Sequence, residues 1–332
     1  MAAIAGDREE RDLVSRVLFV PLRDADAVRY RQEVFKDLEN SALFGQVQRF
    51  SELIGEVRDH LRQSAKMEER YQREGWLLDA AAIYCGAVRS LVGHLASAQI
   101  SSRALLAFRD YLASYVASAG FTTLTADTRS RKEALGQIRY CTRIRGDRVE
   151  VSRYQGEADY SAEVLKTFER FKQGAVKDYR IRYRTWPGIN HVTAEILERV
   201  ALLFPEEFTA LDEYCRRHAA FADEGILRAD RELQFYLAYL GHIRPLRAAD
   251  LPFCYPEVSA SSKEVRAAGT FDLALARKLV SERKPVVTND FHLEGRERIF
   301  VVTGPNQGGK TTFARTFGQL HHLASVGCPV PG

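Results

Sequence analysis

The sequence has 332 residues, of which 45% are hydrophobic and 28% are charged, the composition of a globular protein with room for two or three domains. Its formal net charge of +4 is too small to indicate a partner by itself. No run approaches about 18 uncharged apolar residues and the N-terminus soon turns polar, so we expect a cytoplasmic protein with no signal peptide and no membrane contact. The cysteines are odd in number and never spaced as CxxC, which argues against a disulfide framework or a zinc site; they are Cys85, Cys141, Cys215, Cys254 and Cys328.

Residues 1–137 are predicted to be helical. Apolar positions recur at three- and four-residue steps between Val47 and Leu61, after Ser41 as the expected N-cap. The same pattern runs from Trp76 to Leu95 without a proline, and again over 104–116 after Ser102. A weaker helical pattern continues to about residue 135. Such stripes are typical of helices that pack in a core.

Residues 138–188 change to a two-residue alternation. The stretch "IRYCTRIRGDRVEVSRY" (138–154) has β-branched and aromatic residues on both sides of Arg145-Gly146-Asp147, which predicts a hairpin. A second alternating run, "DYRIRYRTW", spans 178–186. We expect a small β-rich insert between helical segments.

The β-rich insert is basic. Between Ile138 and Arg184 there are twelve Lys or Arg and seven Asp or Glu residues, a net charge of +5 (12 minus 7). Strands that alternate arginine with tyrosine would present guanidinium groups on one face, an arrangement that suits DNA phosphates. Charge alone favours a solvated hairpin without a ligand as strongly as it favours a hairpin that binds DNA. The candidate DNA contacts are Arg143, Arg145, Arg148, Arg153, Arg180 and Arg182.

The remaining chain is predicted to be helical again and then to combine strands with a helix. Residues 189–255 carry two further apolar stripes, with Pro205 predicted to kink or divide the first. Residues 256–332 contain strand candidates at 284–290 ("KPVVTND") and 298–304 ("RIFVVTG"), followed by a helix that starts near Gly309. The predicted fold class is mainly α with a small β insert, followed by an α/β domain.

A phosphate-binding loop lies between the last strand candidate and that helix. Residues 304–311, "GPNQGGKT", satisfy GxxxxGK[ST] in full, with a buried strand expected before them and a helix after them. Glycines let backbone N–H groups turn toward phosphates, Lys310 can reach the outer phosphates, and the Thr311 hydroxyl is placed to ligate Mg²⁺. We therefore predict ATP and Mg²⁺ as ligands. The expected contacts are Gly304, Pro305, Asn306, Gly308, Gly309, Lys310, Thr311 and Thr312.

The loop resembles that of the MutS family of DNA mismatch-repair and recombination ATPases. "TGPNQGGKTT" is similar to the family's "TGPNMGGKST", and the tail "LASVGCPVPG" resembles "LAQIGSFVPA". "GDRVEVSRY" resembles the start of the family's DNA clamp, and "INHVTAEILERVALLF" looks like the lever helix that returns from it. The resemblance follows the whole chain in order and is most specific over 299–332.

The resemblance implies a fold and a function. It assigns a helical core and first lever to 1–137, a clamp to 138–188, a return lever and core helices to 189–255, and the N-terminal part of an ABC-like P-loop ATPase domain to 256–332. It implies DNA as partner and a homodimer of the full-length form. Val286 stands where the family places an aromatic ring against adenine, which implies weaker stacking. The family's mismatch readers begin with a domain that carries a Phe-x-Glu wedge, and nothing before Met67 offers such a domain, so mismatch reading is not expected.

ATP hydrolysis also needs an acidic Mg²⁺ ligand and a water-orienting group from later strands. In this family both follow position 332, so we expect an incomplete, truncated ATPase domain with no catalytic residue in this chain and weak nucleotide binding. Whether the chain acts as an enzyme stays open. Two alternatives remain: a P-loop ATPase of the chromosome-maintenance or transporter type, and a non-enzymatic DNA-binding remnant. His321 and His322 are adjacent on a helix and indicate ordinary packing or surface positions.

Overall fold

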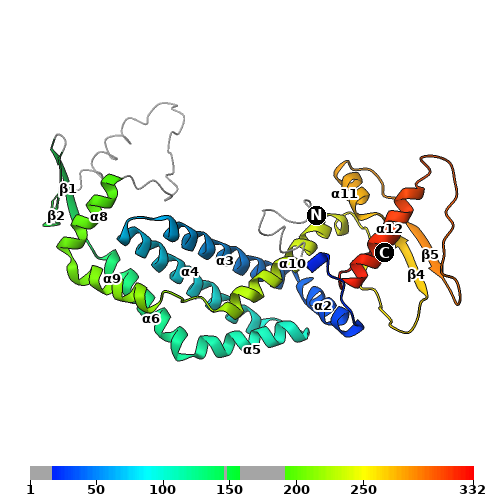
Figure 1. Ribbon diagram of the computed structural model, residues 1–332, viewed down its shortest axis with the longest axis horizontal. Helices are drawn as coiled ribbons and strands as arrows, with labels where there is room; N and C mark the ends of the chain where they lie inside the picture. Colours follow the sequence, from blue (N-terminus) through cyan, green and yellow to red (C-terminus); the bar gives the residue numbers. More distant parts are fainter. Residues whose placement is uncertain (1–16, 146–147, 158–190) are drawn as a thin grey trace. The chain divides into compact units, whose positions relative to one another are not determined.

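A computed structural model describes residues 17–145, 148–157 and 191–332 (Figure 1). This part of the chain is mostly helical. It divides into two compact units, each of which gathers segments distant in sequence. Of the described residues, unit 1 comprises 17–55, 84–121 and 222–332, and unit 2 comprises 56–83, 122–145, 148–157 and 191–221.

The first helices begin at polar caps. In α2 (Ala25–Leu38) the Asp24 carboxylate accepts a hydrogen bond of 2.8 Å from the Ala27 amide. The cap of α3 (Ser41–Lys66) is Asn40, whose side-chain oxygen accepts from the amides of Ala42 and Leu43 at 3.0 and 3.2 Å. The prediction of Ser41 as cap was therefore wrong by one residue, because an asparagine in front of it supplies the acceptor.

Three further helices follow, all predicted from their apolar stripes. They are α4 (Arg70–Ser97), α5 (Arg103–Ala117) and α6 (Ala119–Gly136). The third predicted helix, 104–116, corresponds to α5, and Ser102 caps it. Within the described part of the chain, α4 is the one helix long and apolar enough to cross a membrane by length and composition; 44% of its most apolar stretch is buried, and core helices meet the same criteria.

The core of unit 1 joins α2, α5 and α10 (Glu224–Arg247). Phe35 on α2 is fully buried, and its ring lies 5.7 Å from that of Phe235 and 5.6 Å from that of Tyr239 on α10. At the end of α2 the buried Asp37 carboxylate accepts hydrogen bonds from the amides of Ser101 and Ser102, with distances of 2.8 to 3.1 Å. These contacts fix α2 against both its neighbours.

Unit 2 holds the hairpin that the alternation predicted. Strand β1 (Tyr140–Arg145) pairs antiparallel with β2 (Arg148–Arg153) in a register that joins Arg145 to Arg148. Helix α8 (His191–Leu203) is followed by α9 (Pro205–Arg217), so Pro205 divides the helical stripe as expected. The second predicted alternating run, 178–186, lies outside the described residues.

The C-terminal part of unit 1 differs from the prediction. Its strands form two antiparallel pairs, and no parallel pair occurs among the described residues. In one pair, β3 (Phe253–Cys254) lies beside β6 (Val330–Pro331), and in the other, β4 (Val265–Thr270) lies beside β5 (Asn289–Leu293). The helices of this part are α11 (Leu273–Ser281) and α12 (Lys310–Ser325).

Both strand predictions in this region were wrong in their bounds. β5 begins only at Asn289, after most of the predicted 284–290, and 298–304 is not a strand. Ile299 and Val301 are 80% and 84% exposed, although the sequence predicted a buried strand there. A strand needs a neighbour for its N–H and C=O groups, and no described segment pairs with 298–304.

Candidate nucleotide and nucleic-acid sites

The phosphate loop has the backbone that its glycines predict. Gly304 and Gly309 have φ angles of +148° and +82°, which favour glycine. A Cβ at Gly308 would lie 3.0 Å from the Pro305 carbonyl oxygen, so this close turn also needs glycine. Gln307 adopts a left-handed φ of +67° without being glycine. Several positions of the loop thus favour glycine, and the glycines of the motif specify its tight turn.

The lysine of the motif lies folded onto the loop. Lys310 Nζ donates hydrogen bonds to the carbonyl oxygens of Gly304 and Pro305 at 2.7 and 2.6 Å. Lys310 is also the first residue of α12, and no side chain caps this helix. The first N–H groups of a helix lack partners within it and attract anions. The residues present therefore fit a bound phosphate.

The threonines after the lysine differ in exposure. Thr311 is exposed and Thr312 is partly buried at the start of α12. A hydroxyl in the first helical turn lies beside a phosphate bound at the helix N-terminus. The role of Thr311 as Mg²⁺ ligand stays a prediction, as does the adenine contact of Val286, which is partly buried in the loop segment before β5.

Helix α12 is held to α11 by a buried carboxylate. Asp272 caps α11 through the Leu275 amide at 2.7 Å, and its other oxygen accepts from Arg315 and from Gln319 Nε2, the latter at 3.0 Å. Gln319 Oε1 in turn accepts from the Leu273 amide at 2.9 Å. The hydrogen bond to Asp272 raises the pKa of Arg315. Sequence reasoning missed this network because Asp272 lies 43 residues before Arg315 and 47 residues before Gln319.

An aromatic cluster lies between β5 and α12. Phe291 and Phe300 have ring centroids 5.7 Å apart, and Phe317 lies 5.4 and 5.5 Å from them. His321 packs on Phe317 at 4.2 Å. The cluster places the segment before the phosphate loop against the helix that follows the loop.

The C-terminal end of α12 is packed against α2 and α10 of unit 1. Arg31 on α2 donates a hydrogen bond of 2.7 Å to the Val326 carbonyl, and Tyr239 on α10 donates one of 2.6 Å to the Pro329 carbonyl. Gly327 has a φ of +75°, and a Cβ there would lie 3.0 Å from that of Arg31. The end of the helix that carries the phosphate loop is thus tightly enclosed.

The candidate DNA residues of the hairpin divide between its two faces. Successive side chains of a strand alternate in direction, and directly paired residues share a face. Arg143, Arg145 and Arg148 therefore lie on one face, where Glu150 pairs with Arg143. Arg153 pairs with Tyr140 on the opposite face. The expectation of a single arginine face holds for three of these residues and is wrong for Arg153; Arg180 and Arg182 lie outside the described residues.

Arg153 contacts the protein itself. Its Nε donates a hydrogen bond of 3.1 Å to the Leu203 carbonyl at the end of α8, and its guanidinium lies 4.8 Å from the centre of the Phe204 ring. This side chain fixes the hairpin to the junction of α8 and α9.

Acidic groups moderate the charge near the arginines. The Glu157 carboxylate accepts hydrogen bonds from the Gln155 amide at 2.7 Å and from the Cys141 thiol at 3.3 Å. The hydrogen bond from the Gln155 amide is the main cause of the lowered pKa of Glu157. The face of the hairpin that carries Arg143, Arg145 and Arg148 thus also has two carboxylates near it, those of Glu150 and Glu157.

Comparison with known proteins gives partial matches. No protein-family model matches the chain. It is 35% identical over 92 residues to endonuclease MutS2 of Pediococcus pentosaceus, which covers 28% of this chain and 12% of that protein. It is 28% identical over 193 residues to the DNA mismatch repair protein MutS of Chlorobium phaeovibrioides (57% and 20%), and 34% identical over 95 residues to Msh2 of Dictyostelium discoideum (28% and 10%).

The matches span at most 20% of the length of these three relatives. Two of them are named as DNA mismatch repair proteins, and the third is named endonuclease MutS2. The phosphate loop of this chain, "TGPNQGGKTT", independently resembles the loop of the MutS family. Taken together, the matches and the loop support a relationship between this chain and the MutS family.

Proposed function

We propose that this chain is part of a MutS-like, ATP-dependent DNA-binding protein that acts in DNA repair or recombination. It binds ATP with Mg²⁺ through the phosphate loop and duplex or branched DNA through the hairpin, without reading mismatches, and its full-length form is a homodimer. The observation that carries the proposal is the loop, which combines the full motif, glycine-specific backbone angles and an uncapped helix N-terminus.

In the proposed nucleotide site, the backbone N–H groups of the loop and of the first turn of α12 orient the phosphates. Lys310 leaves the carbonyls of Gly304 and Pro305 and donates to the outer phosphates, and Thr311 offers its hydroxyl to the metal. ATP supplies the phosphoryl group whose cleavage drives such proteins. Asp272, through Arg315 and Gln319, holds the helix that carries these groups.

In the proposed DNA site, Arg143, Arg145 and Arg148 contact phosphates, and Arg153 positions the hairpin. Contacts to the backbone carry no sequence information. Each neutralised phosphate contributes a slope of about −0.9 to the dependence of log affinity on log salt concentration, so three arginines account for about −2.7.

Nucleotide binding is tested with a fluorescent ATP analogue and Mg²⁺. Lys310→Ala is expected to weaken binding by about 10- to 100-fold, because a charged hydrogen-bond donor is lost. Lys263→Ala, at an exposed lysine, removes the same charge as a control. Equal affinities of wild type and Lys310→Ala would reject the nucleotide site.

DNA binding is tested by fluorescence anisotropy with a labelled duplex between about 50 and 200 mM salt. The triple variant Arg143→Gln/Arg145→Gln/Arg148→Gln is expected to bind more weakly with a shallower salt slope. The control neutralises Arg23, Arg228 and Arg296, which are exposed and belong to unit 1. Unchanged binding by the hairpin triple variant would reject the hairpin as the DNA site.

The two measurements also separate the alternatives. DNA binding that persists in Lys310→Ala, together with no nucleotide binding by the wild type, is the result expected of a non-enzymatic DNA-binding module. Nucleotide binding without any DNA binding is the result expected of a different P-loop ATPase.

A further inference from the structure

Helices α4 and α9 meet within unit 2 through one apolar and one charged contact. The ring of Tyr71 on α4 lies 4.8 Å from that of Phe208 on α9. Arg70, the first residue of α4, forms an ion pair with the Asp212 carboxylate of α9. These four residues make up the α4–α9 joint, which neither the phosphate loop nor the arginine face of the hairpin includes.

The arginine of the joint also holds a second carboxylate. Arg70 Nε donates a hydrogen bond of 3.2 Å to Glu74 Oε1, one turn further along α4, while its Nη2 contacts Asp212 Oδ2. One guanidinium thus serves a carboxylate of its own helix and one of the neighbouring helix. Because each contact restricts where the guanidinium can lie, the charge of Glu74 influences how firmly Arg70 is held to Asp212.

Glu74 is poorly placed to carry a charge. Its oxygen Oε2 is buried without a hydrogen-bond donor, and so is Oδ1 of Asp212. A buried carboxylate oxygen without a donor is costly, and the carboxyl group lowers that cost when it takes up a proton. The side chain of Glu74 is 11% exposed and that of Asp212 is 23% exposed. Of the two carboxylates, Glu74 is therefore the one that the proton favours.

The charged and titratable groups around Glu74 come from α4 and α9. On α4 they are Arg70 and Arg73, and on α9 they are Asp212 and Cys215. The Cys215 thiol lies 3.8 Å from the Glu74 carbonyl oxygen. Burial raises the pKa of this thiol to about 12, so it stays neutral. The ionised partners of Glu74 are thus two arginines and one carboxylate.

Burial outweighs the arginines in setting the proton affinity of Glu74. It raises the pKa of Glu74 above 4.5, although Arg70 and Arg73 act to lower it. Helix α3 contributes an uncharged group nearby, the Ser64 hydroxyl, which donates a hydrogen bond of 2.9 Å to the Arg73 carbonyl. The folded protein therefore keeps a proton on Glu74 at a pH at which an exposed glutamate is ionised.

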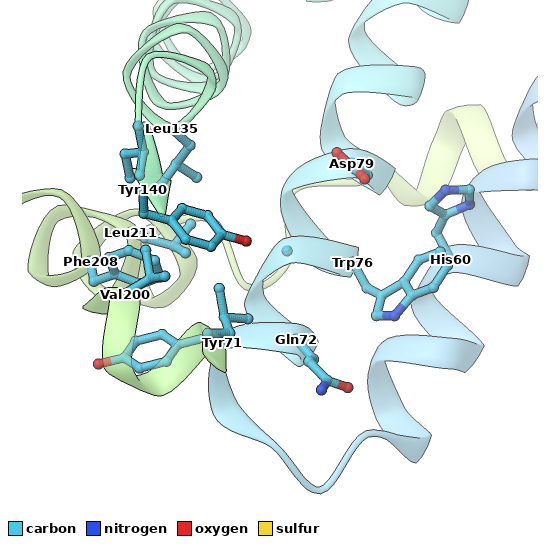
Figure 2. A pocket seen from close by; sticks show the side chains of 13 residues that line it. His60, Tyr71, Gln72, Trp76, Asp79, Leu135, Tyr140, Val200, Phe208 and Leu211 are labelled. Carbon is cyan, nitrogen blue, oxygen red and sulfur yellow. The ribbon is translucent and has the colours of Figure 1, made fainter. Parts of the chain in front are cut away.

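A cavity beside the joint leaves the contact between the helices incompletely packed. It has a volume of about 560 Å³ and is lined by residues of α3, α4, α6, α8, α9 and β1 (Figure 2). Figure 2 shows Tyr140 and Phe208 on one side of this aromatic cavity, with Trp76 and His60 on the other. Tyr71 lines it as well. Close packing resists small displacements, and the cavity removes part of that resistance.

We propose that a proton on Glu74 controls the α4–α9 joint. With the proton bound, Glu74 is neutral and Asp212 alone holds Arg70, which ties α4 to α9. When the proton leaves to solvent, the Glu74 carboxylate draws Arg70 toward its own helix and the bridge to α9 weakens. Because α9 begins directly after Phe204, over which Arg153 lies, the proton also acts on the attachment of the hairpin.

The direction of the pH dependence follows from the raised pKa of Glu74. In the unfolded chain this carboxyl titrates near pH 4.5, and in the folded protein it titrates at a higher pH. The stabilisation by the proton is therefore fully present below about pH 4.5 and is lost as the pH rises through the folded-state pKa.

The proton is followed by ¹³C NMR of the glutamate carboxyl groups between about pH 3 and about pH 9. The signal that disappears in Glu74→Gln belongs to Glu74, and its midpoint in the wild type is expected above pH 4.5. In Asp212→Asn the midpoint is expected to fall, because Arg70 is then left to Glu74 alone. Glu213→Gln removes the exposed carboxylate next to Asp212 and is expected to leave the midpoint unchanged.

Urea unfolding measures the effect on the joint. Glu74→Gln places a neutral amide where the protonated carboxyl lies, so its urea midpoint is expected to match that of the wild type below about pH 4.5. As the pH rises, the variant is expected to become increasingly more stable than the wild type. In the Asp212→Asn background the same substitution is expected to give no gain, because there is no bridge to α9 left to protect.

Three results would overturn the proposal. A Glu74 signal that titrates at or below pH 4.5 would show that folding does not favour the proton. An unchanged midpoint in Asp212→Asn would show that the two carboxylates do not depend on the same arginine. A stability difference between Glu74→Gln and the wild type that stays constant with pH would assign it to packing and not to the proton.

Discussion

The two ends of α12 are held very differently. At the C-terminal end, Leu320 and Leu323 are 7% exposed, and Val326 and Cys328 are fully buried. At the N-terminal end, the segment that leads into the phosphate loop exposes Ile299 and Val301 by 80% and 84%. The stability of the helix therefore comes mainly from the end opposite the loop. Substitutions at the loop end are expected to change binding, and substitutions at the far end are expected to change folding.

The largest expected effect is at the enclosed end. Leu323→Ala is expected to lower the free energy of unfolding by about 2–5 kcal/mol, because it removes buried methyl groups and leaves a cavity. Val301→Ala removes apolar atoms from the exposed end and is expected to cost less than about 0.5 kcal/mol. Urea unfolding of the two variants measures both values. Similar losses would abolish the contrast between the two ends.

The next effect concerns α2, on which the end of α12 rests. Burial acts to raise the pKa of Asp37, but the hydrogen bonds from Ser101 and Ser102 outweigh it and hold the pKa below 3.8. The stabilisation by Asp37 is therefore fully present above that pH and is lost as the pH falls through the folded-state pKa. Asp37→Asn is expected to cost about 2 kcal/mol at neutral pH.

The check is a series of urea unfolding midpoints from about pH 7 to about pH 2.5. The difference between wild type and Asp37→Asn is expected to shrink in acid. A difference that stays constant with pH would show that the charge of Asp37 does not cause it.

A smaller effect is expected at the turn after α12. Gly327→Ala forces a side chain into a left-handed backbone and against Arg31, at a cost of about 1–2 kcal/mol. Gly318→Ala is the matched change inside α12, where a Cβ meets no atom within 4 Å, and is expected to stabilise by up to about 1 kcal/mol. Thermal unfolding of the pair is expected to give shifts of opposite sign.

The smallest effect on stability is expected at the loop itself. Lys310 makes its hydrogen bonds at an exposed site, so Lys310→Ala is expected to change the free energy of unfolding by less than about 0.5 kcal/mol while weakening nucleotide binding. A large loss of stability would mean that the folded-back lysine holds the loop together, and weaker nucleotide binding by Lys310→Ala would then not report on the lysine alone.

Local features of the structure were predictable from the sequence. The hairpin of β1 and β2, Pro205 as a divider and the helix after Ser102 each depend on residues close in the chain. The start of α12 after Gly309 was predictable for the same reason. Turn and cap chemistry acts over a few residues, so a short window contains the information.

Features that depend on distant partners were not predictable. The run 298–304 has the composition of a strand, but composition cannot supply the neighbour that a strand requires. The roles of Asp272 and Arg153 were hidden because each is an ordinary charged residue until folding brings Arg315 or Leu203 beside it. The aromatic cavity was hidden because its walls come from six elements.

The attachment of the hairpin has a mechanical consequence. The Arg153 guanidinium joins the last residue of β2 to the last carbonyl of α8 and also lies over Phe204. Two kinds of contact at one joint resist both bending and twisting. A rotation of α8 would therefore turn β2 as well, and the arginines at the far end of the hairpin would sweep through a larger arc than the helix that moved them.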